Sequence, residues 1–206
     1  MNHILKIDLL RQVHLVFLSI LLLVCHQLYS CQESNLVPAM QDLTLPEKIG
    51  QLFVIATAAD PSSVSIHKEA IKSEQEIVQL IQEQHIGGVI LQGRSTPEEM
   101  VELINLLRRC NIGQKNHLLF CLDAEWGPDM RLSGLESIKI PFNMALGAIS
   151  DDQLIYQTGK EIGRQLHRLG IHINLAPVLD VNSNPQNPII NRRSFGESPE
   201  NVALIL

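Results

Sequence analysis

The feature that most constrains the fold of this chain is a repeated alternation of short apolar runs and amphipathic segments. Four runs have the length and composition of buried strands: residues 52–59, 87–91, 118–122 and 171–181. Between them, apolar residues recur at helical spacing. Alternating strands and helices with apolar strands predict an α/β fold, in which helices cover a parallel sheet.

Helix start and stop signals support this alternation. Ser73 and Glu76 are spaced as a capping box, and Thr96 with Pro97 and Glu99 marks a second helix start. Gly170 is placed to end the long helix before the fourth run. Further starts are expected at Thr44 with Pro46, at Ser150 with Gln153 and at Ser198-Pro199-Glu200, and the inner stripe of the second helix is expected to be Met100, Leu103, Ile104 and Leu107.

The chain length limits how large the sheet can be. A closed (β/α)₈ barrel typically needs about 250 residues. The chain has 206 residues and four strand-like runs, and an export signal would occupy about 30 residues of that length. The expected fold is therefore a partial TIM (β/α)₈ barrel, roughly its first half, with a small open α/β sheet as the alternative. The apolar C-terminus, which has no helix stop signal, favours the half barrel.

The first 31 residues are predicted to be an export signal. Lys6 and Arg11 precede an apolar run over residues 13–24, which is too short to span a bilayer comfortably. The sequence Leu28-Tyr29-Ser30-Cys31 resembles a lipobox, so lipid attachment at Cys31 is one expectation, and plain cleavage or an uncleaved anchor are the others. Residues 32–43 are expected to be a linker and residues 44–206 the folded domain. The expected location is the periplasm or the cell surface.

Composition and charge exclude several classes of function. The net charge of −6 argues against nucleic acid as a partner, because nucleic-acid-binding proteins usually carry a basic stripe. No Cys/His spacing suggests zinc, and Cys110 and Cys121 are expected to be free thiols in a core. We therefore expect neither a metal nor an organic cofactor.

Polar residues gather where the predicted strands end. Asp, Asn and Arg are concentrated in residues 123–131, 176–184 and 191–196. The carboxyl ends of parallel strands meet at one edge of a sheet, where ligands bind. Carboxylates accept hydrogen bonds from hydroxyl groups and arginine donates through a fixed fork. The expected ligand is therefore a sugar.

Several ordered motifs resemble the N-terminal domain of glycoside hydrolase family 3, in its β-N-acetylhexosaminidase-like branch. The motifs are Leu122-Asp123-Ala124-Glu125-Trp126-Gly127 with Arg131, Pro141-Phe142 with Met144-Ala145-Leu146-Gly147, Glu161-Ile162-Gly163, Leu169-Gly170-Ile171, Asn174 to Asn182, and Arg193-Ser194-Phe195-Gly196. Together they cover about 160 residues at spacing similar to that of the family. Trp126 departs from the pattern, since the family more often has glycine there.

The resemblance implies roles for three residues. It implies that Asp123 holds sugar hydroxyls and that Arg131 and Arg193 contact the bound sugar. The implied activity is retaining, exo-acting hydrolysis of β-linked N-acetylhexosamine in peptidoglycan or chitooligosaccharide metabolism. In that branch a Lys-His motif and a later nucleophilic aspartate do the chemistry, and neither is reached here, since His67-Lys68 has the opposite order. This chain is therefore expected to be inactive alone.

Other interpretations stay open. Within the family, a β-glucosidase-like specificity is the nearest alternative. A non-catalytic, truncated sugar-binding lipoprotein and an unrelated surface lipoprotein are rivals from other classes. At the level of residues, Asp123 and Arg131 could form a purely structural ion pair, Trp126 could stack on a sugar or fill its loop, and Glu125 is not expected to be catalytic.

Overall fold

The computed structural model describes residues 42–65, 68–134 and 138–205. The chain divides into two compact units, residues 1–45 and 46–206. The predicted signal at residues 1–31, with Cys31, and nearly all of the predicted linker lie outside the described residues. No helix among the described residues has both the length and the apolar character needed to cross a bilayer.

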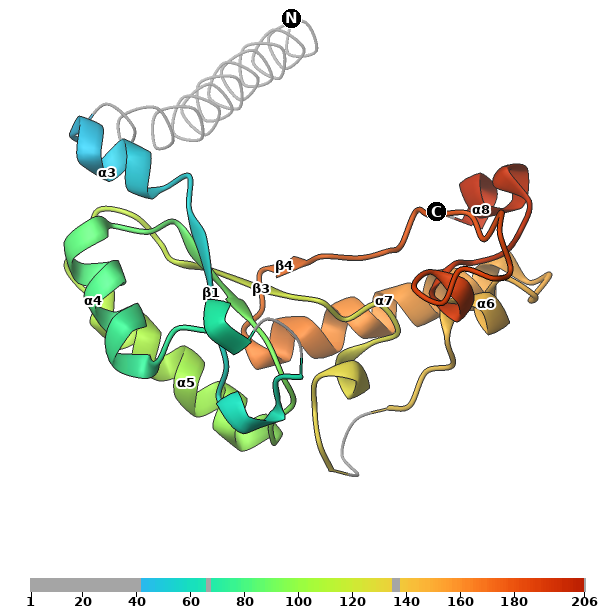
Figure 1. The fold of residues 1–206 in the computed structure, drawn as a ribbon, viewed down its shortest axis with the longest axis horizontal. Coiled ribbons are helices and arrows are strands. Elements are labelled where there is room, and N and C mark those ends of the chain that lie inside the picture. The colour runs from blue at the N-terminus through green and yellow to red at the C-terminus, as the bar shows by residue number, and fades with distance from the viewer. Residues whose placement is uncertain (1–41, 66–67, 135–137, 206) are drawn as a thin grey trace, which may run out of the picture. The chain divides into compact units, whose positions relative to one another are not determined.

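Strands and helices alternate along the described chain (Figure 1). The helices are α3 (Leu45–Gly50), α4 (Glu74–Gln84), α5 (Pro97–Cys110), α6 (Asn143–Leu146), α7 (Asp152–Leu169) and α8 (Pro199–Ile205). The strands are β1 (Val54–Thr57), β2 (Gly88–Leu91), β3 (Leu119–Leu122) and β4 (Ile173–Asn174), and short 3-10 turns cover Pro61–Ser63, Lys68–Ala70, Pro128–Met130 and Asn191–Arg193.

The four strands form one parallel sheet in the order β1-β2-β3-β4. Val54 lies opposite Gly88, Gly88 opposite Leu119, and Cys121 opposite Ile173. Strand order therefore follows chain order, as successive strand–helix units require. The prediction of an α/β fold with a parallel sheet is confirmed, and the sheet of the described residues is open.

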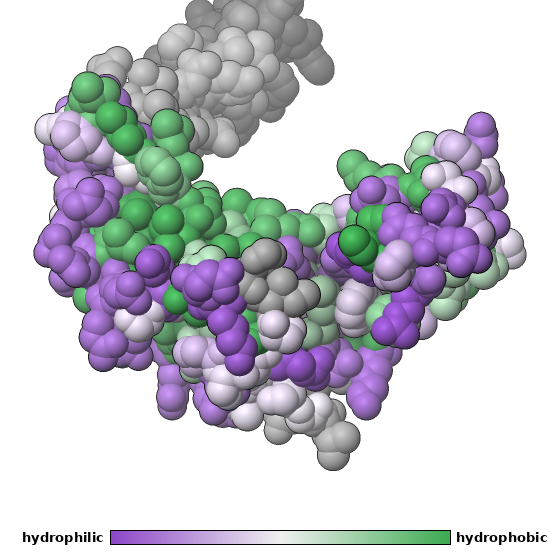
Figure 2. Space-filling model, in the orientation of Figure 1, coloured by the Kyte–Doolittle hydropathy of each residue, from purple (hydrophilic) through white to green (hydrophobic). Residues whose placement is uncertain are grey.

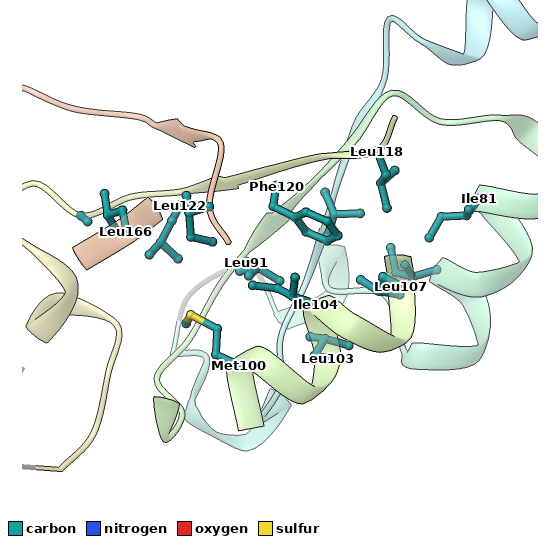
Figure 3. Packing of buried hydrophobic residues seen from close by; sticks show 14 of the residues in the cluster. Ile81, Leu91, Met100, Leu103, Ile104, Leu107, Leu118, Phe120, Leu122 and Leu166 are labelled. Carbon is teal, nitrogen blue, oxygen red and sulfur yellow. The ribbon is translucent and has the colours of Figure 1, made fainter. Parts of the chain in front are cut away.

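One face of the sheet is packed against helices α4 and α5. Phe120, Leu122 and Val89 point to this face and have no exposed surface. They pack against the apolar stripe of α5, as Figure 3 shows for Phe120, Ile104 and Leu107. The whole predicted stripe is buried, namely Met100, Leu103, Ile104 and Leu107. This cluster is the main core.

The opposite face of the sheet is largely uncovered, although Cys121 on it is buried. Val54, Leu119 and Ile173 lie on it and keep 48%, 41% and 38% of their surface exposed. Figure 2 shows apolar surface over the strands. An exposed apolar face of this kind is an aggregation hazard.

Local signals in the sequence set the helix ends. The predicted capping box of Ser73 with Glu76 is present, and the predicted helix start at Thr96 is a capping box too: the Thr96 hydroxyl accepts from the backbone N–H of Glu99, whose carboxylate accepts from the N–H of Thr96. Gly170 ends α7 in the left-handed conformation, at φ 85°. These predictions are confirmed.

Three local predictions are wrong. The fourth strand was expected over residues 171–181 but covers only Ile173–Asn174, because its partner β3 ends at Leu122, opposite Asn174. The cap of α7 is Asp151 instead of Ser150, since the Asp151 carboxylate accepts from the N–H of Leu154 at 3.1 Å. The first run forms a strand only over Val54–Thr57.

Candidate functional site

The loop that follows β3 carries two of the three residues expected to contact a ligand. Asp123 comes directly after the last residue of the strand, Leu122. Gly127 then turns the chain at φ 91°, a conformation that favours glycine, and a 3-10 turn brings Arg131 back toward Asp123. The loop is tied to the segment after β2, because the Ser95 N–H donates to the Arg131 carbonyl at 3.1 Å.

Asp123 and Arg131 form a direct ion pair. The Arg131 Nη2 lies 2.8 Å from Asp123 Oδ2, and its Nε donates to the Asp123 backbone carbonyl at 3.1 Å. The two side chains keep 27% and 17% of their surface exposed, so the pair is half-buried and still open to a ligand. Gln92, at the end of β2, donates weakly to the same Oδ2 at 3.4 Å. Asp123 Oδ1 has no hydrogen-bond partner among the described residues.

Asn174 holds the base of this loop from the end of β4. Its side-chain oxygen accepts from the Ala124 N–H at 3.0 Å, and its side-chain nitrogen lies 3.4 Å from the Ala124 carbonyl oxygen. Gln92 and Asn174 were not predicted as site residues. Each is a polar residue at or directly after the carboxyl end of a strand, which is the signal that could have found them.

Arg193 is held by Glu125 on the same loop. Its Nε and Nη2 lie 2.9 and 2.8 Å from the two carboxylate oxygens of Glu125, and its Nη1 donates to the Ile189 carbonyl at 3.2 Å. The hydrogen bonds to Glu125 raise the pKa of Arg193, and the charges of Asp180 and Asp123 raise it further. Arg193 therefore interacts with the negative charge of Asp123 and lies beside the loop that carries Asp123.

The segment that carries Arg193 is tied to neighbouring segments by hydrogen bonds from side chains to backbone carbonyls and by one close packing contact. The Arg193 carbonyl accepts from the Asn143 side-chain amide at 2.8 Å, and the Ser194 hydroxyl donates to the Asp180 carbonyl at 2.6 Å. Gly147 packs so closely on Phe195 that an added Cβ would lie 1.6 Å from the Phe195 carbonyl oxygen. These contacts bring together the three polar segments predicted from the sequence, residues 123–131, 176–184 and 191–196. We call the edge that these segments form the rim.

The three predicted residues all lie at the rim, but only two of them are in direct contact. Asp123 and Arg131 are in contact, and Arg193 joins them through Glu125, which lies two residues after Asp123. Among the described residues, no three His, Cys, Asp or Glu side chains are grouped so that they could hold a metal ion.

An aromatic stack borders the rim. Trp126 packs edge-on against Phe142 with ring centroids 4.7 Å apart, and the Arg192 guanidinium lies 3.8 Å from the Phe142 ring centroid. The Trp126 side chain is partly exposed. It is therefore engaged with Phe142 and still reachable from solvent.

A groove of about 710 Å³ runs from the rim along α7. Glu125, Asn143 and Asn174 line its rim end, and apolar residues of α7 such as Ile155 and Ile162 line the rest. The Asn143 side-chain oxygen is buried and has no partner among the described residues. Asp123, Arg131 and Arg193 do not line this groove, so the predicted binding residues face a different space.

The sequence is similar to those of known proteins. The sequence model described as "Glycosyl hydrolase family 3 N terminal domain" matches residues 44–205. The chain is 37% identical over 131 residues to "Beta-hexosaminidase A" of Pseudoalteromonas piscicida, covering 60% of this chain and 22% of that protein. It is 28% identical over 158 residues to "Beta-N-acetylglucosaminidase/beta-glucosidase" of Cellulomonas fimi, covering 76% and 25%.

A solved structure of the same family is also similar to this chain. A glycoside hydrolase family 3 β-N-acetylglucosaminidase from Paenibacillus sp. superposes with a TM-score of 0.61 and 35% identity, covering 79% of this chain and 29% of that one. The match thus spans between about a fifth and a third of the length of each of these three relatives.

Proposed function

Since the chain belongs to glycosyl hydrolase family 3, we propose that its rim binds the terminal sugar of a β-N-acetylhexosaminide. The substrates proposed for the whole protein are peptidoglycan fragments or chitooligosaccharides. The terminal sugar of these substrates is removed with retention of configuration at the anomeric carbon. Two β-N-acetylhexosaminidase-type relatives and the Paenibacillus structure support the sugar class.

The observation that carries the proposal is the pairing of Asp123 with Arg131 beside Arg193. One carboxylate oxygen, Asp123 Oδ1, is left to accept from a sugar hydroxyl. Arg131 and Arg193 keep N–H groups that the contacts within the rim do not use, and these can donate to hydroxyl or N-acetyl oxygens. Acceptors and donors side by side are what neighbouring sugar hydroxyls require.

We propose that the 206 residues bind sugar without hydrolysing it. A retaining glycosidase needs a nucleophilic carboxylate and a proton donor on either side of the scissile bond. The sequence contains no Lys-His motif. The two carboxylates after β3 are each engaged by an arginine, Asp123 by Arg131 and Glu125 by Arg193.

Two measurements on the 206-residue chain test this proposal. Ligand-observed NMR should detect N-acetylglucosamine binding that Asp123→Asn weakens about tenfold or more, because a charged hydrogen-bond acceptor is lost. A chromogenic β-N-acetylglucosaminide should not be turned over. Absence of sugar binding would overturn the site, and turnover abolished by Asp123→Ala would overturn the claim that the catalytic pair is missing.

A β-glucosidase-like specificity is the second candidate, favoured by the name of the Cellulomonas fimi relative, which pairs both activities. Glucose and N-acetylglucosamine differ only at C2, so their relative affinities decide between the two. Tighter binding of N-acetylglucosamine supports the hexosaminidase proposal, and equal binding supports the alternative.

We also propose export and lipid anchoring at Cys31. The support is the sequence of residues 13–31 alone. The chain expressed in a bacterium with a radiolabelled fatty acid should carry the label, and Cys31→Ala should lose it. Label that persists in Cys31→Ala would overturn the anchoring site.

A further inference from the structure

Glu125 is the more enclosed of the two carboxylates that follow β3. Its side chain keeps 8% of its surface exposed, against 27% for Asp123. Its two oxygens both face Arg193, at 2.9 and 2.8 Å. The pair is formed across 68 residues of sequence, so it joins the rigid loop after β3 to the segment that follows β4.

The contact with Glu125 decides which edge of Arg193 is available to a ligand. A guanidinium has five N–H groups, and Glu125 takes one from Nε and one from Nη2. Ile189 takes one from Nη1. The remaining two N–H groups, on Nη1 and Nη2, can each donate to a sugar oxygen, while the side-on edge and the positive charge of Arg193 are already paired with the Glu125 carboxylate.

Glu125 also adds to the negative charge of the rim. The three rim segments carry four acidic side chains, Asp123, Glu125, Asp129 and Asp180, and three arginines, Arg131, Arg192 and Arg193. The rim therefore carries one net negative charge. A ligand carboxylate placed there would meet Asp123 and Glu125, whose partners Arg131 and Arg193 are already paired with them, which is unfavourable.

We propose that Glu125 positions Arg193 and makes the rim selective for uncharged sugars over sugar acids. This inference rests on the proposed sugar-binding function and adds a specificity-determining residue to it. Removing the Glu125 charge frees the side-on edge of Arg193 and removes the net negative charge of the rim. The changed site should then accept a uronic acid.

A purely structural ion pair makes a different prediction. If Glu125 only held the loops together, its loss would weaken binding of neutral and acidic sugars by the same factor. The ratio of the two affinities therefore separates a specificity role from a structural one, because a structural defect does not change that ratio.

The single tryptophan of the chain provides the readout. Trp126 is adjacent to Glu125 and packs against Phe142, so its fluorescence reports on ligands at the rim. The probes are N-acetylglucosamine and glucuronic acid, titrated into the 206-residue chain at neutral pH. Glu161→Gln is the matched control, since Glu161 pairs side-on with Arg164 at 2.7 Å within α7 and shares no hydrogen bond with the rim residues.

The natural chain and Glu161→Gln should bind N-acetylglucosamine and bind glucuronic acid at least about tenfold more weakly. In Glu125→Gln, the affinity for N-acetylglucosamine should fall about tenfold, because Arg193 loses the charge-assisted hydrogen bonds that position it. The affinity for glucuronic acid should rise about tenfold, because the sugar carboxylate can take these hydrogen bonds in place of Glu125. Glu125→Asp keeps the charge with a shorter side chain. It should lose affinity for N-acetylglucosamine and still reject glucuronic acid.

The outcomes separate the two proposals. Failure of the natural chain to bind N-acetylglucosamine overturns the proposed function. Binding by the natural chain with an unchanged affinity ratio in Glu125→Gln overturns only the role of Glu125. Should circular dichroism show that Glu125→Gln is unfolded, Glu125→Asp decides: undiminished affinity for N-acetylglucosamine, or binding of glucuronic acid, overturns the role.

Discussion

The sheet with its two helices and the segment after β4 are built in different ways. The first buries sixteen residues in one cluster around Phe120, Ile104 and Leu107. The second rests on a cluster of three, Leu146, Phe195 and Val202, and is held otherwise by hydrogen bonds in loops. Asp123 and Glu125 belong to the first region and Arg193 to the second. Stability and binding chemistry therefore come from different parts of the molecule, and the rim joins them.

Truncating one aromatic residue in each region gives the largest expected contrast. Phe120→Ala should lower the free energy of unfolding by about 3–5 kcal/mol, because it empties a fully enclosed site. Phe195→Ala should cost less, because its few neighbours can collapse into the space. Chemical denaturation measures both. Equal losses would contradict the division into a strong and a weak region.

The close contact between α6 and the Arg193 segment should control binding more than stability. Gly147→Ala places a Cβ 1.6 Å from the Phe195 carbonyl oxygen, so the backbone beside Arg193 must move. Affinity for N-acetylglucosamine should fall about tenfold, since a ligand contact is misplaced. In the matched control Gly159→Ala, on α7, an added Cβ meets nothing within 4 Å. Unchanged affinity in Gly147→Ala would show that this packing does not position Arg193.

Removing one helix cap from each region tests the comparison on a smaller scale. Thr96→Ala should cost about 1 kcal/mol of global stability, because α5 is part of the main core. Ser198→Ala, before α8, should fray that helix locally and leave the global transition unchanged. Denaturation combined with amide hydrogen exchange distinguishes the two results. A global loss in Ser198→Ala would place α8 in the main cooperative unit.

The seam between β3 and β4 should respond to acid. The Phe120 N–H donates to Nδ1 of His172 at 3.0 Å, which requires that nitrogen to be unprotonated. Burial, together with the positive charge of Arg108, lowers the pKa of His172 from its ordinary value of 6.5. Because the folded pKa is the lower one, this contribution to stability is present above pH 6.5 and is lost as pH falls through the folded value.

An NMR titration of His172 checks this, and His172→Asn is the control, since its side-chain oxygen can still accept from Phe120 without titrating. A midpoint at or above 6.5 would contradict the proposed cause.

What could be predicted from the sequence depended on how local the signal was. The capping box at Ser73, the helix start at Thr96 and the stop at Gly170 are confirmed, because each depends on residues within a single turn. The parallel sheet followed from repeated alternation of strands and helices. The length of the fourth strand could not be predicted, because it is set by the end of its partner β3 at Leu122, which the apolar composition of residues 171–181 does not show.

The pairing of Glu125 with Arg193 could not have been predicted. The two residues lie 68 positions apart, and no local pattern connects them. Asp123 and Glu125 lie two residues apart, and each binds a different arginine. Their roles toward a sugar remain predictions.

Mapping the sugar onto the protein tests the central claim most directly. The side-chain Nε–H signals of arginine can be followed by NMR while N-acetylglucosamine is added to the 206-residue chain. The signals of Arg131 and Arg193 should move together with the backbone signals of Asp123 and Trp126, while those of Arg108 on α5 should stay fixed. Shifts confined to α4 and α5, or no shifts at millimolar sugar, would contradict binding at the rim.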